Sequence, residues 1–202
     1  MSSVWADKEE VVFDGEIPVD PSRVYDLLMG ALSEQGRVVV EFLVDGVDAL
    51  REGKFPDQYE KIEIASQTHD ELTLRLIMET MKHLVGMEEQ FTAYACNILR
   101  TPWSEVFKRM EELINKVKPF AELMDNLTPY VQTYKPAWKE KFENLASEQA
   151  DSLGQVLNGF EQGNPAGLSE ELGIRFLEVF KKGRKLFNEE IIPDLKGRIV
   201  SA

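Results

Sequence analysis

The chain is poor in the residues that most often bind metals: its 202 residues include one cysteine, Cys96, and two histidines. A single cysteine excludes an intrachain disulfide framework and any zinc site built from several thiolates. The histidines, His69 and His83, also lack the Glu-x-x-His spacing of di-iron bundles, because Ser66 and Thr80 lie three positions before them. We therefore expect no bound metal and no other cofactor.

Long apolar runs and a leader-like start are missing as well. The first residues, MSSVWADKEEVVF, carry acids where a secretory signal needs a basic start and an apolar stretch. The densest apolar region, residues 72–85, is interrupted by charged side chains and falls short of the roughly 20 apolar residues of a membrane helix. These features predict a cytoplasmic protein without a membrane partner.

Positive charge is scarce: 23 Lys and Arg stand against 36 Asp and Glu, which gives a net charge of −13. Residues 1–67 hold 6 basic and 15 acidic side chains, whereas residues 175–202 hold 7 basic and 4 acidic ones. A nucleic-acid binder needs a cationic surface, so no nucleic-acid partner is expected. We expect the basic last segment to lie against acidic neighbours.

Recognisable catalytic motifs are absent from the sequence. It contains no nucleophile elbow and no His-Glu-x-x-His pair. The stretch from Gly46 to Lys54 ends in Gly-Lys like a P-loop, but six residues separate its glycines and Phe55 replaces the Ser or Thr. Cys96 lies more than three helical turns from His83, so no base is close to it in sequence. We expect no catalytic residues and predict that the protein is not an enzyme.

The first 67 residues carry strand signals around one helix. Three runs of strand formers predict strands at residues 11–13, 38–44 and 61–64. Asp20 followed by Pro21 is typical of a helix start, and Gly36 ends the apolar spacing that follows. Residues 1–67 are therefore predicted to form a small β-α-β-β module.

Residues 68–202 show helical spacing throughout. Thr68 and Glu71 have the spacing of a capping box at the first helix start. Pro102, Pro129 and Pro165 each follow a Thr or Asn and predict further helix starts. The expected helices are about 69–99, 102–126, 129–162 and 165–195, and their short loops predict an antiparallel four-helix bundle. The fold class is thus α+β, mostly α.

Two details of the helical part leave alternatives open. Pro119 and Pro136 follow lysines that do not cap helices, so they predict kinks within helices. A seven-residue apolar repeat runs from Val106 to Trp138 without a break, which suits one kinked helix over 102–160. The dense polar cluster at 125–129 favours two helices instead.

The function predicted from the sequence is that of a non-enzymatic intracellular interaction or regulatory protein, for example one that holds a partner helix as a chaperone does. The candidate interaction surface comprises Phe55 and Tyr59, in a loop before the last strand, with Tyr134 and Trp138, whose polar tips suit an interface. The alternative is a helical bundle that binds a small apolar ligand among its aromatic and methionine side chains.

The partner is expected to be another protein or a second copy of the chain. The strand at 38–44 carries one charge, Glu41, and no proline, so it is poorly protected if it lies at an edge of the sheet. A net charge of −13 opposes such a homodimer, and added salt would weaken this repulsion.

Overall fold

The computed structural model describes residues 2–201 and is mostly helical, with a small mixed sheet of five strands. It divides into two compact units, residues 1–72 (the N-terminal unit) and residues 73–202 (the helical unit). The chain begins with β1 (Ser3–Ala6), β2 (Glu9–Glu10), α1 (Pro21–Glu34), β3 (Arg37–Val44), β4 (Val47–Asp48), α2 (Ala49–Glu52) and β5 (Lys61–Thr68). It continues with α3 (His69–His83), α4 (Met87–Ile98), α5 (Trp103–Lys108), α6 (Met110–Tyr134), α7 (Lys139–Glu161), α8 (Pro165–Glu170), η1 (Glu171–Phe176), α9 (Leu177–Leu186), η2 (Phe187–Ile191) and α10 (Ile192–Ser201), in which η1 and η2 are π-helical.

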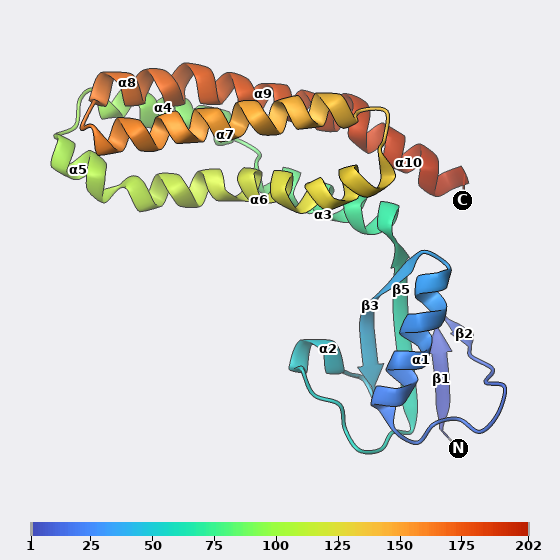
Figure 1. The fold of residues 1–202 in the computed structure, drawn as a ribbon. Coiled ribbons are helices and arrows are strands. Elements are labelled where there is room, and N and C mark those ends of the chain that lie inside the picture. The colour runs from blue at the N-terminus through green and yellow to red at the C-terminus, as the bar shows by residue number, and fades with distance from the viewer. Residues whose placement is uncertain (1, 202) are drawn as a thin grey trace. The chain divides into compact units, whose positions relative to one another are not determined.

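The sheet of the N-terminal unit has the strand order β2-β1-β5-β3-β4, so the last strand in sequence lies at its centre (Figure 1). β5 runs parallel to β1 and antiparallel to β3. The strands β1 and β2 form one tight hairpin, and β3 and β4 form another. The central residues of their turns are Asp7-Lys8 and Asp45-Gly46, and all four have positive φ angles, as in type I′ turns.

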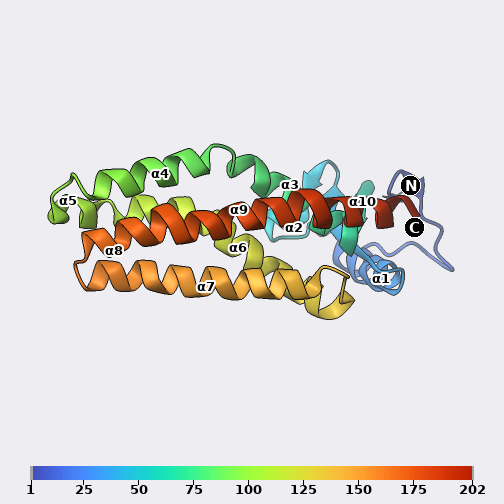
Figure 2. The ribbon, with the colours of Figure 1, turned by 90° about the horizontal axis from the view of Figure 1, so that it is seen from above.

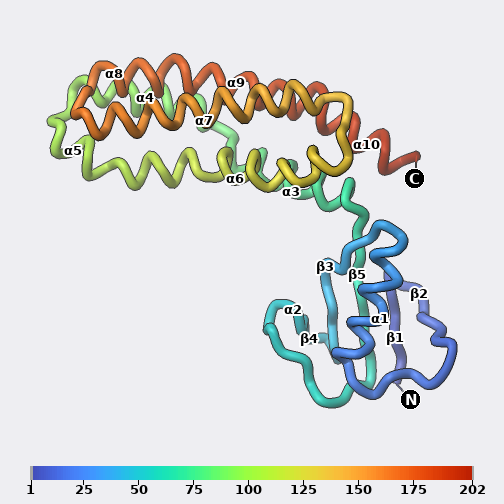
Figure 3. Tube along the Cα trace, in the orientation of Figure 1, coloured from blue at the N-terminus to red at the C-terminus, as the bar shows by residue number. Residues whose placement is uncertain are grey.

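Helix α1 covers one face of the sheet, as the trace in Figure 3 shows. Its start is confirmed, because the Asp20 carboxylate accepts a hydrogen bond of 2.9 Å from the Ser22 amide and Pro21 is the first helical residue. The core between helix and sheet consists of buried apolar side chains from α1, the three long strands and the loops, among them Val4, Val24, Leu28, Leu32, Phe42, Val44, Ile62 and Ile64.

The predicted strand at residues 11–13 is wrong, and the hairpin of β1 and β2 takes its place. The Val11 amide donates one hydrogen bond of 2.8 Å to the Val4 carbonyl, which is the last link of this hairpin. Because β1 is only four residues long, it offers no partner for the rest of the run, and Val12 is 90% exposed.

The predicted strands at 38–44 and 61–64 are confirmed and extend to 37–44 and 61–68. β4 pairs only with Leu43 and Val44, so among the described strands none adjoins residues 37–42 on that side. A register shift between Val39 and Glu41 marks a bulge, which bends an edge strand away from further pairing. Homodimer formation through this strand stays a prediction.

The capping box at the start of α3 is confirmed. The Glu71 amide donates to the Thr68 hydroxyl at 3.1 Å, and the Thr68 amide donates to the Glu71 carboxylate at 2.7 Å. The predicted helix over 69–99 is wrong in its length, because α3 ends at His83. Gly86 has a φ of +77°, a left-handed conformation that breaks the helix before α4.

The predicted helix boundary at 126–128 is also wrong. Thr128 does not act as a cap: its hydroxyl donates to the Met124 carbonyl at 3.0 Å, and α6 continues through Pro129. The helix ends at Tyr134. The predicted kink at Pro136 is therefore wrong, because Pro136 lies after the end of α6 and not inside a helix. Because Pro136 follows it, Lys135 is disfavoured in the right-handed α conformation. It adopts a positive φ of 45° instead, which ends the helix.

The rest of the segment between Pro102 and α7 agrees with the prediction in part. The start near Pro102 is confirmed, but Arg109 divides the predicted first segment into the short α5 and the long α6. Pro119 lies within α6, in agreement with the predicted position inside a helix. The single kinked helix over 102–160 is wrong as well, because residues 135–138 separate α6 from α7.

The start at Pro165 is confirmed, with the Asn164 side chain accepting a hydrogen bond of 3.0 Å from the Gly167 amide. From there α8, η1, α9, η2 and α10 follow without interruption to residue 201, beyond the predicted end at 195. Figure 2 shows this run between α4 and α7. Its basic side chains meet acids as expected: Arg184 pairs with Glu88 of α4, and Lys182 pairs with Glu148 of α7 at 2.7 Å.

Aromatic rings fill the centre of the helical unit. Phe91, Phe120, Phe176 and Phe180 are fully buried, with ring centroids 5.1–5.4 Å apart in edge-to-face pairs. Gly183 allows this close packing, because a Cβ atom there would lie 2.6 Å from the Phe120 ring. These four rings therefore pack against each other at the centre of the helical unit.

Candidate functional site

Two of the predicted interaction residues belong to the core of the N-terminal unit. Tyr59 is buried, and its hydroxyl donates to the Pro18 carbonyl at 2.7 Å. Burial raises the pKa of this hydroxyl above its ordinary value. The Phe55 ring lies 5.6 Å from the rings of Tyr25 and Phe42. The structure thus gives both side chains a role in holding the loop to the sheet.

The other two predicted residues lie together in the helical unit. Trp138 is 3% exposed, and its indole nitrogen donates to the Asp194 carboxylate at 3.0 Å. Tyr134 is 39% exposed, and its ring centroid is 4.7 Å from that of Tyr130. The Arg198 guanidinium lies over the Tyr134 ring, 6.0 Å from its centroid. Tyr134 is therefore the exposed member of the predicted set.

A different surface has the features of a binding site: the face of the sheet opposite α1. Trp5, Glu63 and Leu43 lie side by side on β1, β5 and β3, because the strand register pairs Trp5 with Glu63 and Glu63 with Leu43. Two residues further along, Ala65 pairs with Glu41. We call these five residues the Trp5 face.

The Trp5 face is hollowed and half apolar. Its hollow has a volume of about 590 Å³ and is lined by Trp5, Asp7, Lys8, Glu41, Leu43, Lys61, Glu63, Ile64 and Ala65. Trp5 and Leu43 are partly exposed with Glu63 between them, and the small Ala65 lies two residues further along β5. A partly exposed tryptophan on the same face as an aliphatic side chain, with charged groups among them, has the mixed composition of a protein-binding hot spot.

A hydrogen-bonded cluster fixes one end of this face. The Asp7 carboxylate accepts hydrogen bonds from the Ser66 hydroxyl at 2.5 Å, from the Ser66 amide at 2.8 Å and from Arg37 at 3.1 Å. Partial burial raises the pKa of Asp7, but the hydrogen bonds from Ser66 and the charge of Arg37 outweigh burial, so the net pKa lies below the ordinary 3.8. The ionised carboxylate ties the turn after β1 to β5.

We expect Asp7→Asn to destabilise the N-terminal unit by about 1 kcal/mol at neutral pH, a value reduced because the side chain is 37% exposed. A lowered folded-state pKa stabilises the fold above the unfolded pKa of about 3.9, and this contribution is lost as the pH falls below that value and through the lower folded pKa. Urea unfolding followed by the Trp5 indole resonance should show the loss at pH 7 and a progressively smaller difference as the pH is lowered below about 4. The control is Asp26→Asn on α1, and an equal loss there would contradict the prediction.

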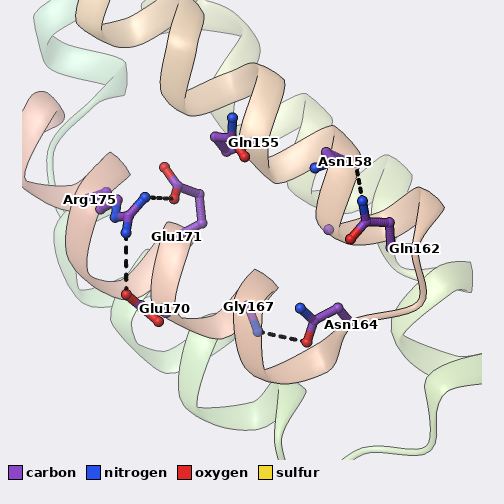
Figure 4. A pocket seen from close by; sticks show the side chains of 9 residues that line it. Gln155, Asn158, Gln162, Asn164, Gly167, Glu170, Glu171 and Arg175 are labelled. Carbon is purple, nitrogen blue, oxygen red and sulfur yellow. Dashed lines mark hydrogen bonds and ion pairs between the residues drawn. The ribbon is translucent and has the colours of Figure 1, made fainter.

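A second hollow, of about 220 Å³, lies within the helical unit between α7 and the α8–η1 segment (Figure 4). Its charged groups already satisfy each other: Glu171 accepts a hydrogen bond of 2.8 Å from Ser152, and Arg175 pairs with Glu171 at 3.3 Å and Glu170 at 3.6 Å. Glu171 is buried on the π-helical turn. This arrangement favours a structural brace between two helices over a site for a ligand.

Within residues 2–201, no group of three or more His, Cys, Asp and Glu side chains is arranged to hold a metal ion. In the same part of the chain, no helix combines the length and the apolar character needed to cross a membrane. The absence of a metal cofactor stays a prediction.

The Trp5 face was not predicted from the sequence, because the first strand was expected at residues 11–13. The signal was present in the alternation of Ser3, Val4 and Trp5, in which Val4 is buried and Trp5 points to the opposite face. Comparisons with protein-family models, with curated proteins and with solved structures found no match to this chain.

Proposed function

We propose that the protein is a non-enzymatic interaction protein whose Trp5 face binds a protein partner. The observation that carries this proposal is a hollowed sheet face on which a partly exposed tryptophan and Leu43 lie on either side of Glu63. Tryptophan is among the residues most enriched in the energetic centres of interfaces, because it removes a large apolar area from water and keeps a polar N–H. The anchoring of Asp7 to Ser66 supports the proposal by holding this face rigid before binding.

The proposal includes the scaffold that carries this face. We propose that the helical unit is an antiparallel four-helix bundle made of α3–α4, α6, α7 and the continuous run from α8 to α10. The shared core supports this arrangement, since all four segments contribute buried apolar side chains to one cluster. The bundle is then the stable part of the protein, and the N-terminal unit is the part that recognises the partner, in the cytoplasm.

Site-specific photocrosslinking tests the proposed function. A photoreactive amino acid in place of Leu43 should form one discrete protein adduct in an extract of the source cells. The same group in place of Met29, which is 45% exposed on α1, should form none. The captured protein, once purified, should bind the unmodified chain at least tenfold more tightly than the Trp5→Ala variant. Equal adducts at both positions, or equal binding of the variant, would refute the proposal.

A further inference from the structure

The N-terminal unit carries almost all of the net charge of the protein. Residues 1–72 contain 6 basic and 17 acidic side chains, a net charge of 6 − 17 = −11, whereas residues 73–202 contain 17 and 19, a net charge of 17 − 19 = −2. A field of one sign on a small unit steers oppositely charged partners toward it and repels others. The charge of this unit therefore favours a positively charged partner.

Of the carboxylates at the Trp5 face, that of Glu63 lies directly beside Trp5, and Lys8 and Lys61 line the same hollow. Glu63 is the direct neighbour of both Trp5 and Leu43, and Glu41 lies on the adjacent strand beside Ala65. Glu63 pairs with Lys61 at 2.8 Å, and both side chains are about half exposed. Glu41 is exposed and makes no ion pair with any residue from 2 to 201, so its charge is available.

Aromatic and acidic groups together recognise a basic side chain. The face of an indole attracts a guanidinium or ammonium group, and tryptophan does so more strongly than the other aromatic residues. A carboxylate adds a charge-assisted hydrogen bond, which is bidentate with arginine. A hollow of about 590 Å³ has room for such a side chain with part of its backbone.

We propose that the Trp5 face binds a cationic segment of a protein partner, with an arginine or lysine side chain against Trp5 and between the carboxylates of Glu41 and Glu63. This inference rests on the proposed function and specifies its partner. The segment lies across β1, β5 and β3, and its apolar side chains contact Leu43. Lys61 competes with the incoming cation for Glu63, so it weakens binding.

The test uses the full chain and a fluorescent hexa-arginine peptide, with a hexa-glutamate peptide for comparison. Fluorescence anisotropy should show saturable binding of the arginine peptide, weakened by added salt, and no binding of the glutamate peptide. Of the three indole N–H resonances, that of Trp5 should shift while those of Trp103 and Trp138 stay in place. A shift confined to the latter two would place the peptide in the helical unit and overturn the inference.

Three single-charge variants separate this site from the general acidity of the unit. Glu41→Gln should weaken binding about fivefold, and Lys61→Gln should strengthen it by a similar factor, because each changes a charge at the hollow. Asp26→Asn removes the same charge as Glu41→Gln from α1, on the other side of the sheet, and should change the affinity less than twofold. Equal weakening by Asp26→Asn and Glu41→Gln would overturn the inference.

The outcomes also distinguish this inference from the proposed function. If the Leu43 crosslink captures a partner but the arginine peptide does not bind, the cationic specificity is wrong and the interaction function stands. If the captured protein is a second copy of this chain, bound without a basic segment in the hollow, the cationic specificity is again wrong and the interaction function again stands. If the peptide binds as described and no crosslink forms, the face binds cations without the proposed partner.

Discussion

Replacement of Phe180 by alanine is expected to destabilise the helical unit by about 4 kcal/mol. The ring is fully buried, and its centroid lies 5.1 Å from that of Phe120 on α6 and 5.4 Å from that of Phe91 on α4. Truncation removes the transfer free energy of the ring and leaves a cavity where α4, α6 and α9 meet. The surrounding rings cannot fill this cavity, because edge-to-face contacts hold them in place.

Urea unfolding followed by far-ultraviolet circular dichroism measures this loss, since most of the helical signal comes from this unit. The matched control is Leu157→Ala on α7, where the side chain is already 50% exposed, and its effect should stay below about 1 kcal/mol. If both variants unfolded at the same urea concentration, Phe180 would not be at the centre of the core.

The second large effect is expected at Glu171, whose replacement by alanine should destabilise the helical unit by about 3 kcal/mol. The buried carboxylate accepts a hydrogen bond from Ser152 on α7 and pairs with Arg175 one turn further along its own segment. Its removal leaves the Ser152 hydroxyl buried without its acceptor and separates the two helices at the π-helical turn.

Glu170 provides the control for this prediction. It also pairs with Arg175, at 3.6 Å, but its side chain is 60% exposed, so Glu170→Ala should cost less than about 1 kcal/mol. Thermal and urea unfolding of the two variants give the comparison. Glu171→Gln should lie between them, because the amide still accepts the hydrogen bond from Ser152 but carries no charge for Arg175. Equal stabilities of the two alanine variants would show that burial of Glu171 has no effect.

Local signals predicted the helix starts well. Asp20 and the Thr68–Glu71 pair act over three or four residues, and the structure contains the hydrogen bonds that their spacing implies. Asn164, before Pro165, is a further cap of this kind, since its side chain accepts a hydrogen bond from the Gly167 amide. Such caps depend on the backbone next to them and on little else, so tertiary packing does not override them.

Helix ends and breaks were harder to predict, because signals of similar strength compete there. Gly86 lies between Leu84 and Met87, whose three-residue step continues the apolar stripe and conceals the break. Thr128 and Pro129 have the chemistry of a helix start, yet Leu127, Tyr130 and Val131 are buried in one continuous helix face. The gain from burying that face outweighs the hydrogen bond lost at the proline.

The candidate site depended on long-range pairing, which sequence patterns do not specify. Tyr59 and Trp138 have the polar tips typical of interface residues, but these tips find partners inside the protein, at Pro18 and Asp194. Trp5 became recognisable as a surface residue only from its register with Glu63, a residue 58 positions away in the sequence.

The central place of β5 also determines when the N-terminal unit becomes foldable during synthesis. β1 and β3 are joined only through β5, and their other neighbours, β2 and β4, are two residues long. Until residue 68 has been made, the nascent chain has two short hairpins and α1 but no sheet, even though the domain comes first in the sequence. Such long-range pairing is slow and leaves strand edges open. We expect the dense negative charge of these residues to keep nascent chains apart until the sheet closes.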